Sequence, residues 1–233
     1  MVSLEKIVSL AKRRGFVFSG SEIYGGLAGT WDLGHLGSEL AHNIKELWWN
    51  RFVRSRDDMY GLASSILMPE KIWEVSGHLE GFSDPLGEGQ RFNLMFKTEV
   101  GATQLEKNTA YLRPEIAQGM FINFKNILDT MRPALPFGIA QIGKAFRNEI
   151  APRDFLFRVR EFDLMELEYF VKEAEWEEHF EKWRKEIWVW IEEIGIDKNK
   201  VHELEVPDGE RAHYSKRTVD FEFDYPFGKK ELY

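Results

Sequence analysis

The 233-residue sequence contains no cysteine. This absence excludes disulfide bridges, cysteine-ligated zinc sites and thiol nucleophiles. No stretch approaches the roughly 20 consecutive apolar residues of a membrane-spanning helix. The amphipathic start, "MVSLEKIVSLAKRRG", also lacks the unbroken apolar run of a signal peptide. We therefore expect a cytoplasmic protein without a membrane partner, in a compartment where thiols and not disulfides prevail.

Positive charge is in short supply, with 31 Lys and Arg residues against 39 Asp and Glu residues and a net charge of −8. This balance argues against a nucleic-acid-binding surface over the whole protein but leaves room for a local basic patch. The six histidines show no metal-ligand spacing, and His213 is expected to be structural. Apolar residues make up 43% of the sequence, including 18 Phe and 8 Trp, which is enough for a substantial core.

Hydrophobic periodicity predicts a mixture of helices and strands. Stripes with helical spacing, together with start and stop residues, predict helices over 3–14, 37–54, 70–80, 113–131 and 173–194. Strands are predicted over 58–69, 92–101, 137–149, 155–170 and 218–228, with a turn over 81–90. These elements predict an α+β fold, an antiparallel β-sheet flanked by helices, in a single domain over 1–233.

Two of these segments carry more detailed predictions. In the helix over 113–131, Pro114 is expected in the first turn. Its buried face is expected to contain Ile116, Met120, Phe121, Phe124 and Leu128. Six glycines between 20 and 37 are interpreted as structural turns, because no Lys-Ser/Thr follows them as in a phosphate-binding loop.

The stretch "AFRNEIAPRDFLFRVREFDLMELEYF", residues 145–170, interleaves arginines, carboxylates and aromatic rings. Alternation along the first strand places Arg147 and Glu149 on one face with Gly143 and Ala145, and these small neighbours leave room for a ligand. On the second strand, one face is predicted to carry Arg158, Arg160, Phe162 and Glu166.

These side chains suit a ligand that has phosphates, a flat base and an amine. Guanidinium groups donate paired hydrogen bonds to phosphate, an aromatic ring stacks on a purine, and a carboxylate holds an ammonium group. The alternative is an exposed hairpin with cross-strand ion pairs, each contributing only ~0.2–1 kcal/mol. The pattern alone leaves both interpretations open.

The segments "FRNE", "FRVREF" and "MELEYF" resemble motif 2 of class II aminoacyl-tRNA synthetases, in the form found in homodimeric glycyl-tRNA synthetases. On this resemblance, motif 2 covers about 143–170 and motif 1 about 29–69. The stretches "GHLGSELAHNIKELWW", "RDDMYGL" and "YLRPEIAQGMFINFKN" resemble the same family. The resemblance extends over nearly the whole chain.

The resemblance implies ATP-dependent activation of glycine to glycyl-adenylate, followed by transfer to the acceptor end of tRNA(Gly). It also implies ATP as a substrate, Mg²⁺ as a helper and a homodimer. The glycine carboxylate is already ionised at pH 7, so the first step needs no general base. Positioning and stabilisation of charge on phosphate would then supply the catalysis.

By motif match, the catalytic residues would be Arg147, Glu149 and Phe162. Arg147 would contact the α-phosphate and the substrate carboxylate, and Phe162 would stack on adenine. The implied ATP site contains Arg147, Asn148, Glu149, Phe157, Arg158, Val159, Arg160, Glu161, Phe162, Glu231 and Leu232.

Glycine would be held by Glu115, Arg147, Phe162 and Glu166, and Glu231 would also serve Mg²⁺. The alternative for Glu115, Glu166 and Glu231 is that each is a salt-bridged surface group.

The sequence departs from the family in two ways. Only a short segment, "PLGEGQR", stands between Asp84 and Phe92, where the family has a long insertion, and nothing resembles motif 3 or the anticodon-binding domain. We therefore expect a truncated catalytic domain with weakened activity, either a natural short form or an engineered or ancestral-like minimal core. Two alternatives are a non-catalytic fragment that binds nucleotide, tRNA acceptor stem or a partner chain, and a folding unit completed by a separate chain.

Overall fold

The computed structural model describes residues 2–87, 89–103, 107–212 and 214–233. His213 lies outside the described residues. Contacts divide the chain into two compact units, one formed by Met1–Leu10 with Glu173–Tyr233 (unit 1) and the other by Ala11–Lys172 (unit 2). The single-domain division and the motif boundaries stay predictions, and each unit is described in turn.

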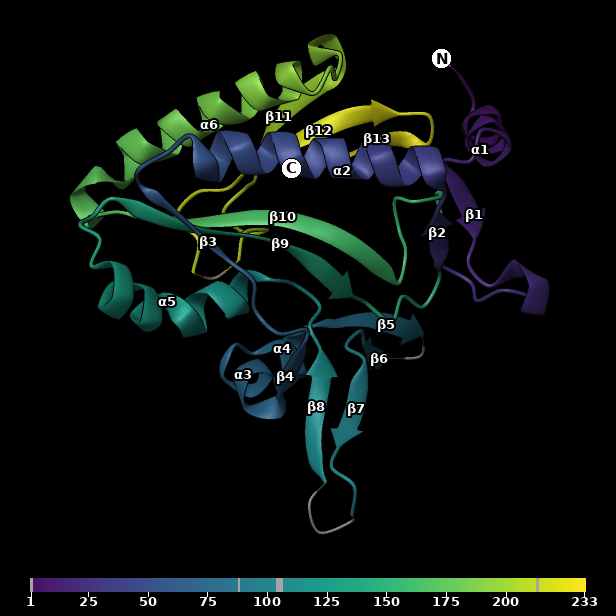
Figure 1. Cartoon of the computed structure of the whole chain (residues 1–233), viewed down its shortest axis with the longest axis horizontal. Helices are drawn as coiled ribbons and strands as arrows, with labels where there is room; N and C mark the ends of the chain where they lie inside the picture. The colour runs from purple at the N-terminus through teal and green to yellow at the C-terminus, as the bar shows by residue number, and fades with distance from the viewer. Residues whose placement is uncertain (1, 88, 104–106, 213) are drawn as a thin grey trace. The chain divides into compact units, whose positions relative to one another are not determined.

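Unit 2 is organised around a three-stranded sheet in the order β10-β9-β3 (Figure 1). Strands β9 (Phe137–Phe146) and β10 (Glu161–Phe170) pair antiparallel over ten residues, and β3 (Met59–Leu62) pairs parallel with β9. The predicted α+β fold is confirmed. The pairing of β3 with β9 adds one parallel pair to a set of otherwise antiparallel ladders.

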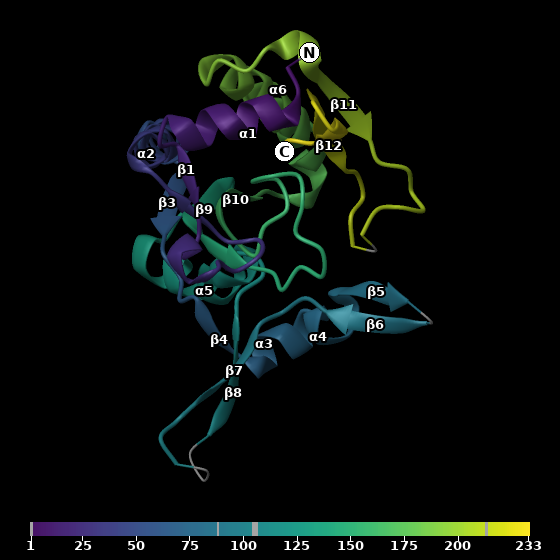
Figure 2. The same cartoon turned by 90° about the vertical axis from the view of Figure 1, so that its right-hand side faces the viewer.

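The two faces of this sheet carry different helices (Figure 2). Helix α5 (Ala117–Met131) packs on the face that presents Phe137, Ile139 and Phe170. Helix α2 (His35–Trp49) is tied to the other face by an ion pair of 2.9 Å between Lys45 and Asp163. Because α5 covers only one end of its face, the end that carries Phe162 and Glu166 is left for other groups.

The remaining elements of unit 2 are short. A hairpin near its start contains β1 (Val17–Ser19), η1 (Glu22–Tyr24) and β2 (Trp31–Leu33), and a π-helical turn η2 (Asn50–Arg54) extends α2. A second sheet, in the order β4-β8-β7, and the hairpin β5–β6 flank two small helices. Their bounds are β4 (Leu67–Pro69), α3 (Glu70–Val75), α4 (His78–Gly81), β5 (Ser83–Gly87), β6 (Gln90–Asn93), β7 (Lys97–Val100) and β8 (Asn108–Leu112).

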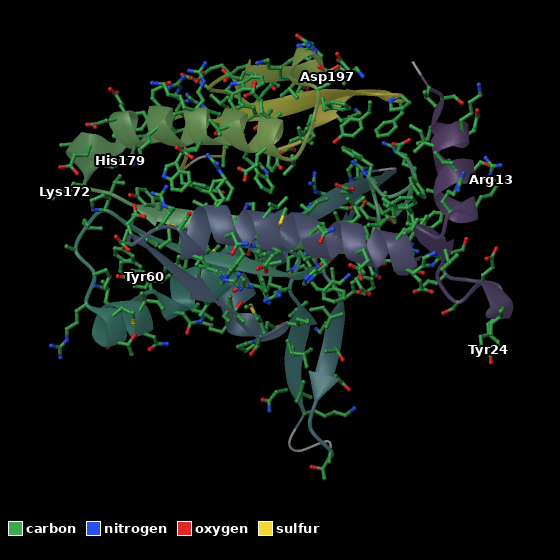
Figure 3. All side chains as sticks on the ribbon, turned by 45° about the horizontal axis from the view of Figure 1, so that its top comes forward. Arg13, Tyr24, Tyr60, Lys172, His179 and Asp197 are labelled. Carbon is green, nitrogen blue, oxygen red and sulfur yellow. The ribbon has the colours of Figure 1, made fainter. Side chains whose placement is uncertain are left out.

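Unit 1 packs a long helix on a three-stranded antiparallel sheet. Its core joins Ile191, Val201 and Phe221. His179 and Asp197, labelled in Figure 3, lie near the start of the helix and beyond its end. The elements are α1 (Leu4–Arg13, which ends in unit 2), η3 (Glu173–Glu175), α6 (Trp176–Glu193), η4 (Lys198–Lys200), β11 (Val201–Glu205), β12 (Val219–Tyr225) and β13 (Gly228–Glu231).

Three predicted strands are wrong in extent. The strand over 58–69 breaks into β3 and β4, and the strand over 92–101 is divided between β6 and β7. The strand over 155–170 begins only at Glu161, because Asp154 and Phe155 have φ angles of 59° and 61°, a conformation that an extended strand does not contain. The turn over 81–90 contains strand β5 and the beginning of β6.

Helix α5 also differs from its prediction. It begins at Ala117, so Pro114 precedes the helix and does not form its first turn. Met120 is fully buried, but Phe121, expected on the buried face, is 49% exposed. Within the described ranges, none of the helices combines the length and apolar character that crossing a lipid bilayer requires.

We expect Met120→Ala to lower the free energy of unfolding by about 2–5 kcal/mol, because it leaves a cavity between α5 and the sheet. Phe121→Ala, on the exposed side of the same helix, should cost less than about 1 kcal/mol. Urea unfolding followed by circular dichroism measures both values. Equal losses in the two variants would contradict the observed burial of α5.

Candidate active site

The guanidinium of Arg147 is held between two aromatic rings. Its Cζ atom lies 5.3 Å from the ring centre of Phe82 and 5.2 Å from that of Phe162. Its Nε–H donates to the carbonyl of Pro114 at 3.1 Å, and its backbone N–H donates to the carbonyl of Arg160. Cation–π contacts on two sides and a hydrogen bond at the base restrict the direction in which this charge points.

Glu115, one of the predicted glycine ligands, lies near this cation. Glu115 Oε2 is 3.3 Å from Nε2 of His78. Burial raises the pKa of Glu115, but the hydrogen bond and charge of His78, the hydrogen bond of Gln118 and the charge of Arg147 together bring it below its ordinary value. Glu115 is therefore an ionised carboxylate at neutral pH.

Glu166 behaves differently from Glu115. Burial and the nearby charge of Glu115 raise the pKa of Glu166 to about 7, although a hydrogen bond from the Ile116 backbone and the charge of Arg147 act in the opposite direction. Glu168, two residues along the same strand face, has its pKa raised to about 8 by burial and by the charges of Glu166 and Glu115. Three carboxyl groups thus lie close together in a weakly solvated region, where the charge of one disfavours the ionisation of the next.

Three buried polar atoms near these carboxyl groups have no hydrogen-bond partner within the described part of the chain. They are Oε2 of Glu166, Oε1 of Gln118 and Nε2 of Gln141. Gln141 is directly opposite Glu166 in the β9–β10 register, so their side chains leave the sheet on the same face. Because an unpaired buried polar atom is costly, this arrangement favours a ligand that both donates and accepts hydrogen bonds.

A buried polar network lies on the same face of the sheet. Gln141 Oε1 accepts hydrogen bonds from the backbone N–H and the hydroxyl of Ser64, at 3.1 and 2.9 Å. Arg113, only 3% exposed, donates to the carbonyls of Ser64 and Lys144 at 2.8 and 2.7 Å. Burial lowers the pKa of Arg113.

The prediction that Gly143 leaves room for a ligand is wrong, because a side chain of this network occupies that room. A Cβ atom at Gly143 would lie 2.2 Å from Nη2 of Arg113, so the guanidinium of Arg113 already fills that space. The small residue at this position accommodates a protein side chain and not a substrate.

The loop 149–160 departs from the predicted face of aligned arginines. Arg158 and Arg160 precede β10 and so do not share its alternation with Phe162. Arg160 donates to the backbone carbonyls of Ala28 and Glu149, and Arg158 Nε is 3.9 Å from the buried Glu149 carboxylate. Arg160 therefore serves to hold two loops together.

The glycine-rich segment contacts this loop directly. Gly29 has a φ of 75°, and a Cβ atom there would lie 2.6 Å from the ring of Pro152. Next to this contact, Trp31 and Phe155 make an edge-to-face pair at 5.0 Å. Gly29 thus allows a close approach between backbone segments, which agrees with the interpretation of these glycines as structural.

The other residues of the implied ATP site make contacts of their own within each unit. Within unit 2, Val159 is buried, Glu161 pairs with Lys144 at 3.3 Å, Phe157 is exposed, and the backbone of Asn148 bonds to Leu94. In unit 1, Glu231 ends β13 and Leu232 packs against the Phe221 cluster. The assignment of these residues to ATP stays a prediction.

The described residues do not include a group of three or more His, Cys, Asp or Glu side chains arranged to hold a metal ion. The role of Glu231 in binding Mg²⁺ stays a prediction, because Mg²⁺ is commonly held by one or two carboxylates together with phosphate oxygens and water.

Some residues of the site escaped the sequence analysis. His78 was considered only for metal spacing and Phe82 only as part of a turn, because neither lies in a motif. Gln141 and Arg113 had a usable signal, since each is a polar residue directly between apolar neighbours in or next to a strand. Glu168 shares its strand alternation with Glu166 and could have been found in the same way.

The comparisons with known proteins identify the class to which this site belongs. Residues 96–231 match the tRNA synthetase class II core domain (G, H, P, S and T), and the chain belongs to this family. The match includes Glu115, Arg147, Phe162 and Glu166.

Within that class, the similar curated proteins are named glycine–tRNA ligases. The one from Treponema denticola is 44% identical over 263 residues, covering 99% of this chain and 58% of the relative. The proteins from Caldanaerobacter subterraneus subsp. tengcongensis and Borrelia hermsii are each 42% identical, covering 100% of this chain and 62% and 59% of the relatives. The chain thus spans about three fifths of the length of these relatives, and they contain residues for which this chain has no counterpart.

The raised pKa of Glu166 predicts a pH-dependent stability. Between about pH 4.5 and 7 the folded state keeps a proton on Glu166 that the unfolded state loses, so the free energy of unfolding falls as the pH rises through this window. At about 1.4 kcal/mol per pKa unit, Glu166 alone accounts for a loss of up to about 3 kcal/mol.

Glu166→Gln should remove this part of the loss and be the more stable protein at pH 7 and above. Urea unfolding across the window measures the difference. Glu161→Gln, on the same strand but exposed, is the control and should keep the wild-type pH dependence. If Glu166→Gln shows an unchanged slope, Glu166 does not titrate as described.

Proposed function

We propose that this chain activates glycine with ATP to form glycyl-adenylate, and transfers the glycyl group to tRNA(Gly). The observation that carries the proposal is the placement of one clamped guanidinium, that of Arg147, beside the half-buried carboxyl groups of Glu115 and Glu166. An amino acid bound there would direct its ammonium group to the carboxylates and its own carboxylate towards the arginine. The names of the related proteins support glycine as the amino acid.

In the activation step, an oxygen of the glycine carboxylate attacks the α-phosphorus of ATP. The bond from this phosphorus to the bridging oxygen of pyrophosphate breaks, and pyrophosphate leaves with the electron pair. Arg147 would stabilise the negative charge that builds up on the α-phosphate, and its fixed position means that little reorganisation is needed during the reaction. No proton has to be removed from glycine's carboxylate.

The carboxyl groups would bind the ammonium group of glycine. Glu115 is ionised, and a bound cation would favour the ionised form of Glu166 as well, because an opposite charge lowers the pKa of a carboxyl group. The ammonium N–H groups would also give Oε2 of Glu166 the hydrogen-bond partner that it lacks within the described residues. Binding of the substrate would thereby relieve the electrostatic repulsion within the site.

The ring of Phe162 would support the adenine. One side of this ring is taken by the guanidinium of Arg147, so a base would stack on the other side. Arg147 and the base would then lie on opposite sides of one ring.

Exchange of labelled pyrophosphate into ATP tests the activation step. We expect exchange that depends on glycine and is far weaker with alanine or serine, and we expect Arg147→Ala to lower it by about 10²–10³-fold because a charge-stabilising donor is lost. Lys125→Ala, an exposed cation on α5, should retain wild-type exchange. Absence of glycine-dependent exchange in the wild-type chain would refute activation, and nucleotide binding alone would then favour a non-catalytic module.

We also propose that the chain forms a homodimer through the motif 1 region. Helix α2 presents Leu36, Leu40 and Leu47 to solvent, so these three leucines are uncovered in the single chain. An exposed row of leucines on one helix is a common feature of a subunit interface.

Leu40→Glu should shift the protein from dimer to monomer, because it places a charge in the centre of that row. Light scattering after gel filtration measures the mass of each species. Leu86→Glu, at an equally exposed leucine in β5, is the matched control and should leave the mass unchanged. A monomeric wild-type protein would end the dimer proposal without affecting the activation proposal.

A further inference from the structure

Helix α4 and the residue that follows it bring two side chains to the active site from outside the motifs. His78, the first residue of α4, has its Nε2 atom 3.3 Å from Oε2 of Glu115. Phe82, directly after α4, forms one of the two rings around Arg147. One short segment therefore touches both the anionic and the cationic part of the site.

His78 is itself firmly held. Its Nδ1 atom is 2.8 Å from the hydroxyl of Ser76, and its ring lies against Trp73 at 5.3 Å and Phe82 at 5.4 Å. The side chain is only 13% exposed. If Ser76 donates its hydroxyl hydrogen to Nδ1, the remaining ring hydrogen is on Nε2 and points to Glu115. The ring thus directs one donor at one carboxylate.

Phe82 is anchored in the same cluster. It packs against the buried core formed by Met68, Trp73, Met95 and Tyr111. The ring of Phe82 also contacts the guanidinium of Arg147. The same guanidinium contacts the ring of Phe162. Loss of the Phe82 ring would leave Arg147 with an aromatic contact on one side only and greater freedom to rotate.

We propose that His78 and Phe82 are positioning residues of the activation reaction, His78 by orienting the carboxylate of Glu115 towards the substrate ammonium group and Phe82 by fixing the guanidinium of Arg147 towards the α-phosphate. This inference rests on the proposed function and adds two residues outside motifs 1 and 2 to its machinery. It also separates two effects, because His78 acts on glycine binding and Phe82 acts on the chemical step.

The test for His78 compares two substitutions in the full chain by pyrophosphate exchange. His78→Leu keeps a side chain of similar bulk but loses the donor, and should raise the KM for glycine about tenfold while the KM for ATP stays within about twofold. His78→Gln can place an amide donor near the position of Nε2 and should return the glycine KM to within about threefold of the wild-type value. Equal glycine KM values in His78→Leu and wild type, or no rescue by His78→Gln, would overturn this role.

The test for Phe82 uses the same assay. Phe82→Leu keeps an apolar side chain in the core but loses the ring, and should lower kcat about tenfold with a smaller change in the KM for glycine. Phe82→Tyr keeps the ring and should remain within about twofold of wild type. An unchanged kcat in a folded Phe82→Leu protein would overturn this role, and thermal unfolding confirms that each variant is folded.

Nuclear magnetic resonance distinguishes failure of this inference from failure of the proposed function, because it needs no turnover. In protein labelled with ¹³C at glutamate carboxyl groups, with Glu115 assigned from a Glu115→Gln sample, His78→Leu should move the pKa of Glu115 upward and His78→Gln should leave it low. For the second residue, the side-chain N–H signal of Arg147 should report greater mobility in Phe82→Leu than in Phe82→Tyr. Inactive wild-type protein that shows both effects refutes the proposed function alone, whereas unchanged signals refute the positioning roles.

Discussion

The guanidinium of Arg147 lies between the rings of Phe82 and Phe162 and donates to the carbonyl of Pro114. This one group joins four segments that are far apart in the sequence: the end of α4, the turn before α5, the end of β9 and the start of β10. Its charge also favours the ionised form of Glu115, whose pKa is lowered, and opposes the burial and the Glu115 charge that raise the pKa of Glu166. The geometry of the site and its electrostatics therefore depend on the same contact.

The site brings three carboxyl groups close together, those of Glu115, Glu166 and Glu168, and the first two lie near the charge of Arg147. Glu115 is ionised, whereas burial and mutual repulsion keep Glu166 and Glu168 partly protonated near neutral pH. A bound cation would favour the ionised forms of these half-buried carboxyl groups, because an opposite charge lowers the pKa of a carboxyl group. The buried Arg113 lies on the same face, above Gly143, but its hydrogen bonds go to backbone carbonyls and the Ser64 hydroxyl.

The sequence was sufficient to predict the parts of the site that follow local rules. Alternation along a strand correctly placed Phe162 and Glu166 on one face of β10, and the β9–β10 pairing was expected from neighbouring strands. The same rule failed for Arg158 and Arg160, because two residues with positive φ end the regular alternation before β10 begins. Contacts between distant segments, such as that of Phe82 with Arg147 or of Arg113 with Ser64, have no local pattern and became visible only in the folded chain.

Strand β10 presents consecutive residues to two different surroundings. Phe162 faces the active site, whereas Asp163 points to the opposite side of the sheet and pairs with Lys45 of α2. The helix that we propose as a subunit contact and the ring that we propose as an adenine support are thus attached to adjacent peptide units. One strand therefore carries, on its two faces and at neighbouring positions, the ion pair to α2 and the aromatic ring beside Arg147.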